Sequence, residues 1–213
     1  MFGFNKNEMR VLRRLNAPPK IQDFLGTLAM NFEEHGDTYN SPRVVLREQQ
    51  AHCLEGALLA AAALWINGEP PLIMNLKSAG LPDVDHVLTL FRRSGRWGAI
   101  SKTNHAVLRY REPVYKSVRE LAMSCFHEYF LDDGRKMLRS FSRPLDLRRF
   151  ARQGWTIAEE KLDYLADALD DQPHEQILTP PLVRRLRLAD PIEIAAGKLV
   201  EWRPGRRRPF QEK

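Results

Sequence analysis

Residues 52–76 read HCLEGALLAAAALWINGEPPLIMNL and hold the most apolar helix pattern of the chain, followed directly by a strand pattern. The turn at 67–71, Asn-Gly-Glu-Pro-Pro, suits neither a helix nor a central strand. It therefore separates a buried central helix, predicted from Cys53 to Trp65, from a short apolar strand, predicted from Leu72 to Leu76. The periodicity of the sequence changes here from helical to β.

The β pattern continues for about forty residues beyond this helix by the alternation of apolar positions. Val84 to Phe91 and Trp97 to Ile100 are predicted as two strands, with Ser94-Gly95 as the turn between them. Ala106 to Tyr110 and Val114 extend the β region. These segments together predict an antiparallel sheet.

Helix signals precede the central helix. Asn5 can cap a helix that runs through Leu15, and apolar residues from Ile21 to Leu28 recur at helical spacing. Ser41-Pro42 begins a third helix, because serine accepts a hydrogen bond from a free amide and proline at the first helical position loses none.

Helix signals return after the β region. A capping box at 117–120 predicts a helix with an inner side that includes Cys125 and Tyr129, ended by 132–134. Residues 136–142 are predicted as a further strand, and a second capping box at 156–159 predicts a helix to about Leu169.

Helices, then an antiparallel sheet, then helices again indicate an α+β fold. We expect an N-terminal helical segment at 1–40, an α+β core at 41–175 and a basic C-terminal extension at 176–213.

The amino-acid composition limits the classes of protein to which the chain can belong. The chain has 213 residues, of which 43% are hydrophobic and 28% charged, as in ordinary folded proteins. The longest apolar run, Ala57 to Ile66, is half of what a membrane-spanning helix needs, and the N-terminus lacks a signal peptide's apolar core. We therefore expect a cytoplasmic protein that does not enter a membrane. Its two cysteines, Cys53 and Cys125, should be reduced thiols.

The same inspection excludes several kinds of site. Two cysteines cannot build a metal site by cysteine spacing, and His52 and His105, which we expect to be polar loop or surface residues, lack ligand spacing. Glycine motifs that bind phosphate are absent, which excludes nucleotide hydrolysis. We expect neither a metal nor a cofactor.

Positive charge gathers at the C-terminus. Residues 184–213 contribute +5 of the net charge of +6, and 203–210 read RPGRRRPF. Such a tail is compatible with an anionic partner, either a nucleic acid or an acidic protein.

Two residues stand out for their chemistry. Cys53 lies at the start of a long helix, where free amides and the positive end of the helix dipole favour a thiolate. His86 lies on a hairpin strand, which can hold an imidazole base rigidly against that thiol. Such a pair is typical of a cysteine nucleophile activated by histidine.

At this point the chain resembles the transglutaminase-like branch of the papain-like cysteine hydrolase superfamily, over roughly residues 45–105. That family has a cysteine at the start of a helix, a histidine on a strand and an acid on the next strand. The positions that match are Cys53, Ala57, Leu64, Gly68 and Pro70 in the cysteine segment, and His86 and Trp97 in the histidine segment. The family usually has an aspartate four residues after the tryptophan, where this chain has Ser101.

The third catalytic residue is therefore open. A two-residue hairpin loop places His86 opposite Thr103, and a four-residue loop places it opposite Ser101. Ser101 is the first candidate by position. Asn104 is the second, since an amide oxygen can accept the imidazole proton, although strict alternation puts it on the other face of the sheet.

The resemblance also implies an oxyanion site made by the cysteine amide and an upstream side chain, for which Gln49 and Gln50 are the candidates. It implies a papain-like or transglutaminase-like core with extra terminal helices. The activity it implies is cysteine-dependent acyl transfer, or hydrolysis of an amide or peptide bond, on a protein, peptide or small amide substrate. The alternative is a noncatalytic transglutaminase-like domain that binds an anionic partner through the basic tail.

Overall fold

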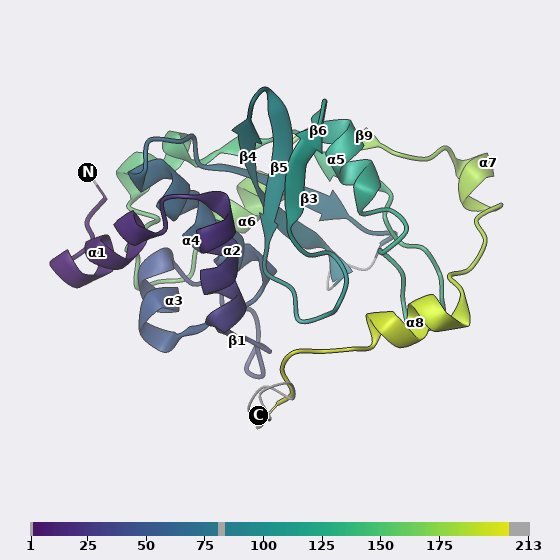
Figure 1. Ribbon diagram of the computed structural model, residues 1–213, viewed down its shortest axis with the longest axis horizontal. Coiled ribbons are helices and arrows are strands. Elements are labelled where there is room, and N and C mark those ends of the chain that lie inside the picture. Colours follow the sequence, from purple (N-terminus) through teal and green to yellow (C-terminus); the bar gives the residue numbers. More distant parts are fainter. Residues whose placement is uncertain (1, 81–83, 205–213) are drawn as a thin grey trace.

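The computed structural model describes residues 2–80 and 84–204, and its centre is an antiparallel sheet of seven strands (Figure 1). The strand order is β6-β5-β4-β3-β7-β9, and β8 also pairs with β3. The strands are β3 Leu72–Lys77, β4 His86–Arg93, β5 Arg96–Ser101, β6 Arg111–Tyr115, β7 Ser140–Ser142, β8 Leu145–Asp146 and β9 His174–Gln176. A separate parallel pair joins β1 Ala29–Met30 to β2 Gln50–Ala51.

Helices cover the sheet. The four N-terminal ones are α1 Lys6–Arg14, α2 Pro18–Thr27, α3 Pro42–Glu48 and α4 Cys53–Ile66. The later ones are α5 Val118–Ser124, the 3₁₀ helix Leu147–Gln153, α6 Asp163–Asp170, α7 Pro180–Val183 and α8 Pro191–Gly197. The described structure is therefore an α+β arrangement, as the sequence predicts.

Helix α4 lies between the sheet and the helices α1–α3 (Figure 1). Every residue from Leu54 to Leu64 is buried, which is why this helix is apolar on all sides. Gly56 allows the closest approach, because a Cβ atom there would lie 2.4 Å from Cβ of Lys102, just past the end of β5. The start of α4 is thus brought against the end of the β4–β5 hairpin.

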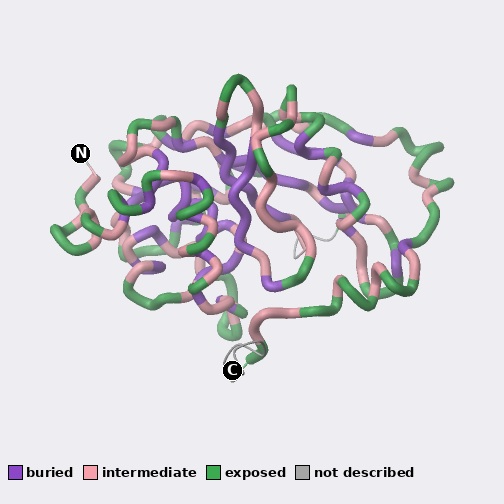
Figure 2. The backbone as a smooth tube through the Cα atoms, in the orientation of Figure 1, coloured by how far each residue is buried: buried purple, intermediate pink, exposed green. Residues whose placement is uncertain are grey.

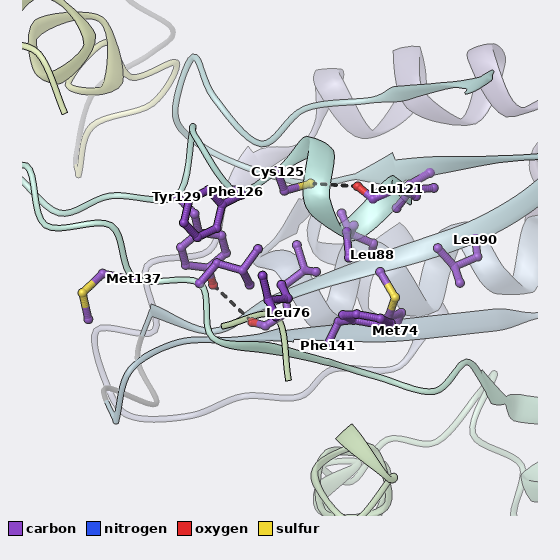
Figure 3. Close-up of a cluster of buried hydrophobic side chains, with 14 residues drawn as sticks. Met74, Leu76, Leu88, Leu90, Leu121, Cys125, Phe126, Tyr129, Met137 and Phe141 are labelled. Atoms are coloured by element: carbon purple, nitrogen blue, oxygen red, sulfur yellow. Dashed lines mark hydrogen bonds between the residues drawn. The ribbon is translucent and has the colours of Figure 1, made fainter. Parts of the chain in front are cut away.

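Side chains that alternate along the strands pack into two different hydrophobic cores, one on each face of the sheet. Val87 and Ile73 pack with α4, whereas Leu88, Leu90 and Met74 pack on the other face. Figure 3 shows this second cluster, in which Leu121, Cys125, Phe126 and Tyr129 cover the strands. Burial concentrates in the sheet and in α4, whereas the chain from α7 onward is mostly exposed (Figure 2).

Most sequence predictions of local structure are confirmed. Asn5 forms a full capping box with Glu8, and Ser41 caps α3 with Pro42 as its first residue. Helix α4 begins at Cys53, and β3 follows the predicted turn. In the β4–β5 hairpin, Ser94 and Gly95 have positive φ values of 49° and 77°, as a two-residue hairpin turn requires.

Four predictions of local structure are wrong in extent or position. Residues 106–110 form a loop instead of a strand. Helix α5 ends at Ser124, and Phe126 and Tyr129 after it are buried although the chain there is no longer helical. Only 140–142 of the predicted strand 136–142 is β.

The fourth concerns Thr156, which does not cap a helix. Its hydroxyl donates to the carbonyl of Phe2, and α6 begins only at Asp163. The competing bond is to a segment 154 residues away in the chain, which no local pattern reveals.

The ends of the chain pack differently. Leu12, Ile21 and Leu25 of α1 and α2 share a core with α4, so the N-terminal segment is part of the main body. Most of the predicted basic tail, 205–213, lies outside the described residues. Within 2–80 and 84–204, no helix combines the length and apolar character needed to cross a membrane.

Candidate active site

Cys53 is the first residue of α4 and is partly exposed. Its backbone N–H has no acceptor within the helix, because the first amides of any α-helix lack one. His52 precedes it as the N-cap, and Nδ1 of His52 accepts a hydrogen bond from the Leu54 amide at 3.3 Å. The thiol therefore lies at the positive end of the helix dipole.

His86 is the first residue of β4, and its Nε2 lies 2.8 Å from Oγ of Ser101, the last residue of β5. The hairpin register pairs Leu88 with Ser101, which corresponds to the two-residue loop. By this register His86 faces position 103, and Ser101 is its diagonal neighbour on the same face of the sheet. Ser101 and His86 therefore make contact although they are not directly opposite each other in the sheet.

The hydroxyl of Ser101 determines which nitrogen of His86 carries the proton. Its single hydrogen is donated to the carbonyl of Leu108, 2.6 Å away. Its oxygen must therefore accept from His86, which places the imidazole proton on Nε2. Nδ1 of His86 is left with a lone pair that can accept the proton of Cys53, which lines the same cleft and whose pKa this ring lowers.

Two further side chains, those of Gln22 and Glu128, hold Ser101 and Leu108 in place. Gln22 donates to the Ser101 carbonyl and accepts from the Ser101 amide, both at 2.9 Å. Leu108 has a left-handed backbone, with φ of 57°, and its amide donates to Glu128 at 2.8 Å. Glu128 is itself paired with Arg111 at 2.5 Å. These bonds stabilise a backbone conformation that a leucine rarely adopts.

A cleft of about 720 Å³ opens beside the thiol. Cys53, His52 and His86 lie along it, together with the segment 102–108 and the turns around Tyr129. Its volume is within the range of about 300–1,000 Å³ that is usual for small-molecule pockets.

Electrostatics favour the thiolate of Cys53. Burial by itself raises the pKa of this thiol, but hydrogen bonds from His52 and His86 and the charges of both rings outweigh it and lower the pKa to about 5. Cys125 behaves in the opposite way, since burial in the apolar cluster of Figure 3 raises its pKa. Its thiol donates to the carbonyl of Leu121 at 3.9 Å. The two cysteines are therefore a reactive candidate and an inert reference in one chain.

His52 is buried, which contradicts the prediction that it is a loop or surface residue. Its Nε2 lies 3.5 Å from Glu33 Oε1 and 3.6 Å from Glu55 Oε1. Burial lowers the pKa of His52, but the Cys53 thiolate and the carboxylates of Glu55 and Glu33 raise it to about 9.

Glu55 is completely buried and fully hydrogen-bonded. Its carboxylate accepts from the side chains of Asn31 and Thr38 and from the amides of Asn40 and His52, at 2.7–3.2 Å. Four donors of this kind satisfy the oxygens of a buried carboxyl group. Glu55 thereby ties the loop between β1 and α3 to the start of α4.

The other predicted site residues do not reach the thiol. Asn104 exchanges hydrogen bonds with the backbone of Trp202, at 2.8 and 3.0 Å, so its amide holds the C-terminal segment and does not orient His86. Gln49 is exposed and donates to the carbonyl of Leu46 at the end of α3. Gln50 belongs to β2 and lines a separate cavity with Ala29. The oxyanion assignment of both glutamines is thus unsupported by their positions.

Four contributors to the site are not among the residues that the sequence singles out. Leu108 acts through its backbone, and Gln22 and Glu128 act across long sequence separations. Glu55 was detectable in principle, because it stands three residues after the N-cap His52, where a capping box places an acid. Histidine is an uncommon N-cap, and this conceals the pattern.

The comparisons with known proteins return no match, either among the models of protein families or among the curated proteins.

Proposed function

We propose that this protein is a cysteine-dependent enzyme of transglutaminase-like type, which transfers or hydrolyses the acyl group of an amide or peptide. The observation that carries the proposal is that Cys53 and His86 line one cleft and that His86 is bound to Ser101, whose own proton is committed to Leu108. A histidine whose Nε2–H is held by an acceptor has its other nitrogen ready for the thiol, as acid–base catalysis requires.

The order of elements supports the same assignment. A cysteine begins a helix, a histidine lies on a strand, and the group that orients the histidine lies on the next strand. The departure from the family pattern is Ser101 in place of an aspartate. A hydroxyl oxygen can replace a carboxylate oxygen as the acceptor, although it adds no negative charge.

The reaction proceeds in two stages. The Cys53 thiolate attacks the carbonyl carbon of the amide, and the Cys53 N–H stabilises the oxyanion. The His86 imidazolium gives its proton to the leaving nitrogen, the C–N bond breaks, and a thioester with the enzyme remains. Water or an amine then gives a proton to His86 and attacks the thioester, and the thiolate leaves.

Trapping of the acyl-enzyme tests this proposal. The protein is mixed with activated acyl esters and with peptide carboxamides, quenched in acid, digested, and analysed by mass spectrometry. We expect an acyl group on the peptide that contains Cys53, absent in Cys53→Ala and unchanged in Cys125→Ala. A folded wild-type protein that forms no adduct with any of these donors, or forms it equally on Cys125, contradicts the proposal.

A further inference from the structure

His52 differs from His86 in what stands behind the ring. His86 is held by the neutral hydroxyl of Ser101, whereas Nε2 of His52 lies 3.5–3.6 Å from two carboxylates, those of Glu33 and Glu55. The family that this chain resembles has an acid beside the histidine of the strand. In this chain the two acids lie instead beside His52, the histidine next to the nucleophile.

This placement has an electrostatic consequence. Glu55 is buried two residues after Cys53, and a carboxylate so close opposes the formation of a thiolate. A charged ring between them reverses the effect, because it faces the carboxylates with Nε2 and also contacts the thiol.

We propose that His52 is a positioning residue that stays protonated, held by Glu33 and Glu55, and serves as a fixed counter-charge for the Cys53 thiolate while His86 exchanges protons with the substrate. Only the proton of His86 then moves during the reaction. The inference rests on the proposed role of Cys53 as the nucleophile.

The surroundings of His52 support a charged ring. The titratable groups that face it are Cys53 and Glu55 of α4, Glu33 and Tyr39 of the loop between β1 and α3, and, across the thiol, His86 of β4. The edge of the Tyr39 ring lies against the imidazole, with centroids 6.1 Å apart. Protonation of Nδ1 costs only the bond from the Leu54 amide, which at 3.3 Å is long.

A substitution can remove the charge and keep the helix cap. Asparagine is among the best N-cap residues, and its side-chain oxygen can accept from the Leu54 amide as Nδ1 does. In His52→Asn we expect the pKa of Cys53, followed by thiolate absorbance in the ultraviolet, to rise by at least one unit. At pH 5 the rate of alkylation by iodoacetamide then falls at least about fivefold and recovers at higher pH.

Glu33→Gln provides a second test and has a matched control. The glutamine oxygen can keep the bond from the Thr38 amide but loses the charge that faces His52. We expect a smaller rise of the thiol pKa in this variant, and none in Glu34→Gln, where the neighbouring glutamate is exposed. If His52→Asn does not fold, the contrast between these two glutamate variants decides.

The proposal is overturned if Cys53 titrates in folded His52→Asn, or in Glu33→Gln when only that variant folds, as it does in the wild type. These titrations need no substrate, so they separate the inference from the proposed function. A shifted titration in a protein that never forms an acyl-enzyme refutes the enzyme and leaves the role of His52 intact. Normal turnover together with an unshifted titration refutes the role of His52 alone.

Discussion

Replacement of Ser101 by alanine removes the group that connects His86 to the backbone of Leu108. The hydroxyl makes two hydrogen bonds, at 2.8 Å to His86 Nε2 and at 2.6 Å to the Leu108 carbonyl, and the residue is 2% exposed. A hydrogen bond of this kind contributes about 1 kcal/mol net, so the free energy of unfolding should fall by about 2 kcal/mol.

The bond to His86 carries the effect on reactivity. Without an acceptor at Nε2, the ring loses about 1 kcal/mol of preference for the tautomer and orientation that face the thiol. By about 1.36 kcal/mol per pKa unit, this loss corresponds to a rise of about 0.7 unit in the pKa of Cys53, which lowers the rate of its alkylation about threefold at pH 5. Ser101→Thr keeps a hydroxyl and is the matched control, with a rate close to the wild type.

The assay is alkylation with iodoacetamide, quantified by mass spectrometry on the peptides of Cys53 and Cys125, with urea unfolding measured on the same samples. The reasoning is refuted if folded Ser101→Ala alkylates Cys53 at the wild-type rate between pH 5 and pH 7. A reduced rate in Ser101→Thr as large as that in Ser101→Ala refutes it as well, since the hydroxyl is then not the cause.

Two other substitutions separate site chemistry from packing. Asn104→Ala should leave the pH profile of Cys53 alkylation unchanged and increase hydrogen exchange in residues 199–202. The reason is that the Asn104 amide binds this segment and not His86. A shifted pH profile would instead identify Asn104 as the residue that orients His86. Gly56→Ala should lower the free energy of unfolding by about 1–3 kcal/mol, because its Cβ would lie 2.4 Å from Cβ of Lys102. Urea unfolding measures this change. An unchanged free energy would show that α4 can move away from Lys102 without cost.

Local rules predicted the elements that hold the nucleophile and the base. The five-residue stop after Trp65 marks the end of α4, and Ser94-Gly95 is a turn pair that supports positive φ at both positions. The same rules predict Cys53 at the start of its helix and His86 on a hairpin strand, although that strand begins at His86 and not at Val84, and the position of Ser101 after Trp97 indicates it as the partner of His86.

Tertiary contacts determine what local rules could not predict. Ser101 orients His86 only because a left-handed leucine at 108 takes the serine proton, and that backbone conformation depends on Glu128. Asn104 has the right chemistry for the role but is bound to a segment almost one hundred residues later. The burial of His52 follows from the loop that Glu55 binds, and no periodicity of the sequence indicates it.

The pH dependence of Cys53 alkylation in the folded protein tests the central claim most directly, with Cys125 as internal reference and His86→Ala as comparison. Because the pKa of Cys53 is lowered to about 5, the wild type should stay reactive down to that pH and lose about tenfold per unit below it, while Cys125 stays inert. His86→Ala should raise the pH at which reactivity appears. If Cys53 instead reacts only near pH 8.5, like an ordinary thiol, and His86→Ala changes nothing, the histidine-activated nucleophile is contradicted.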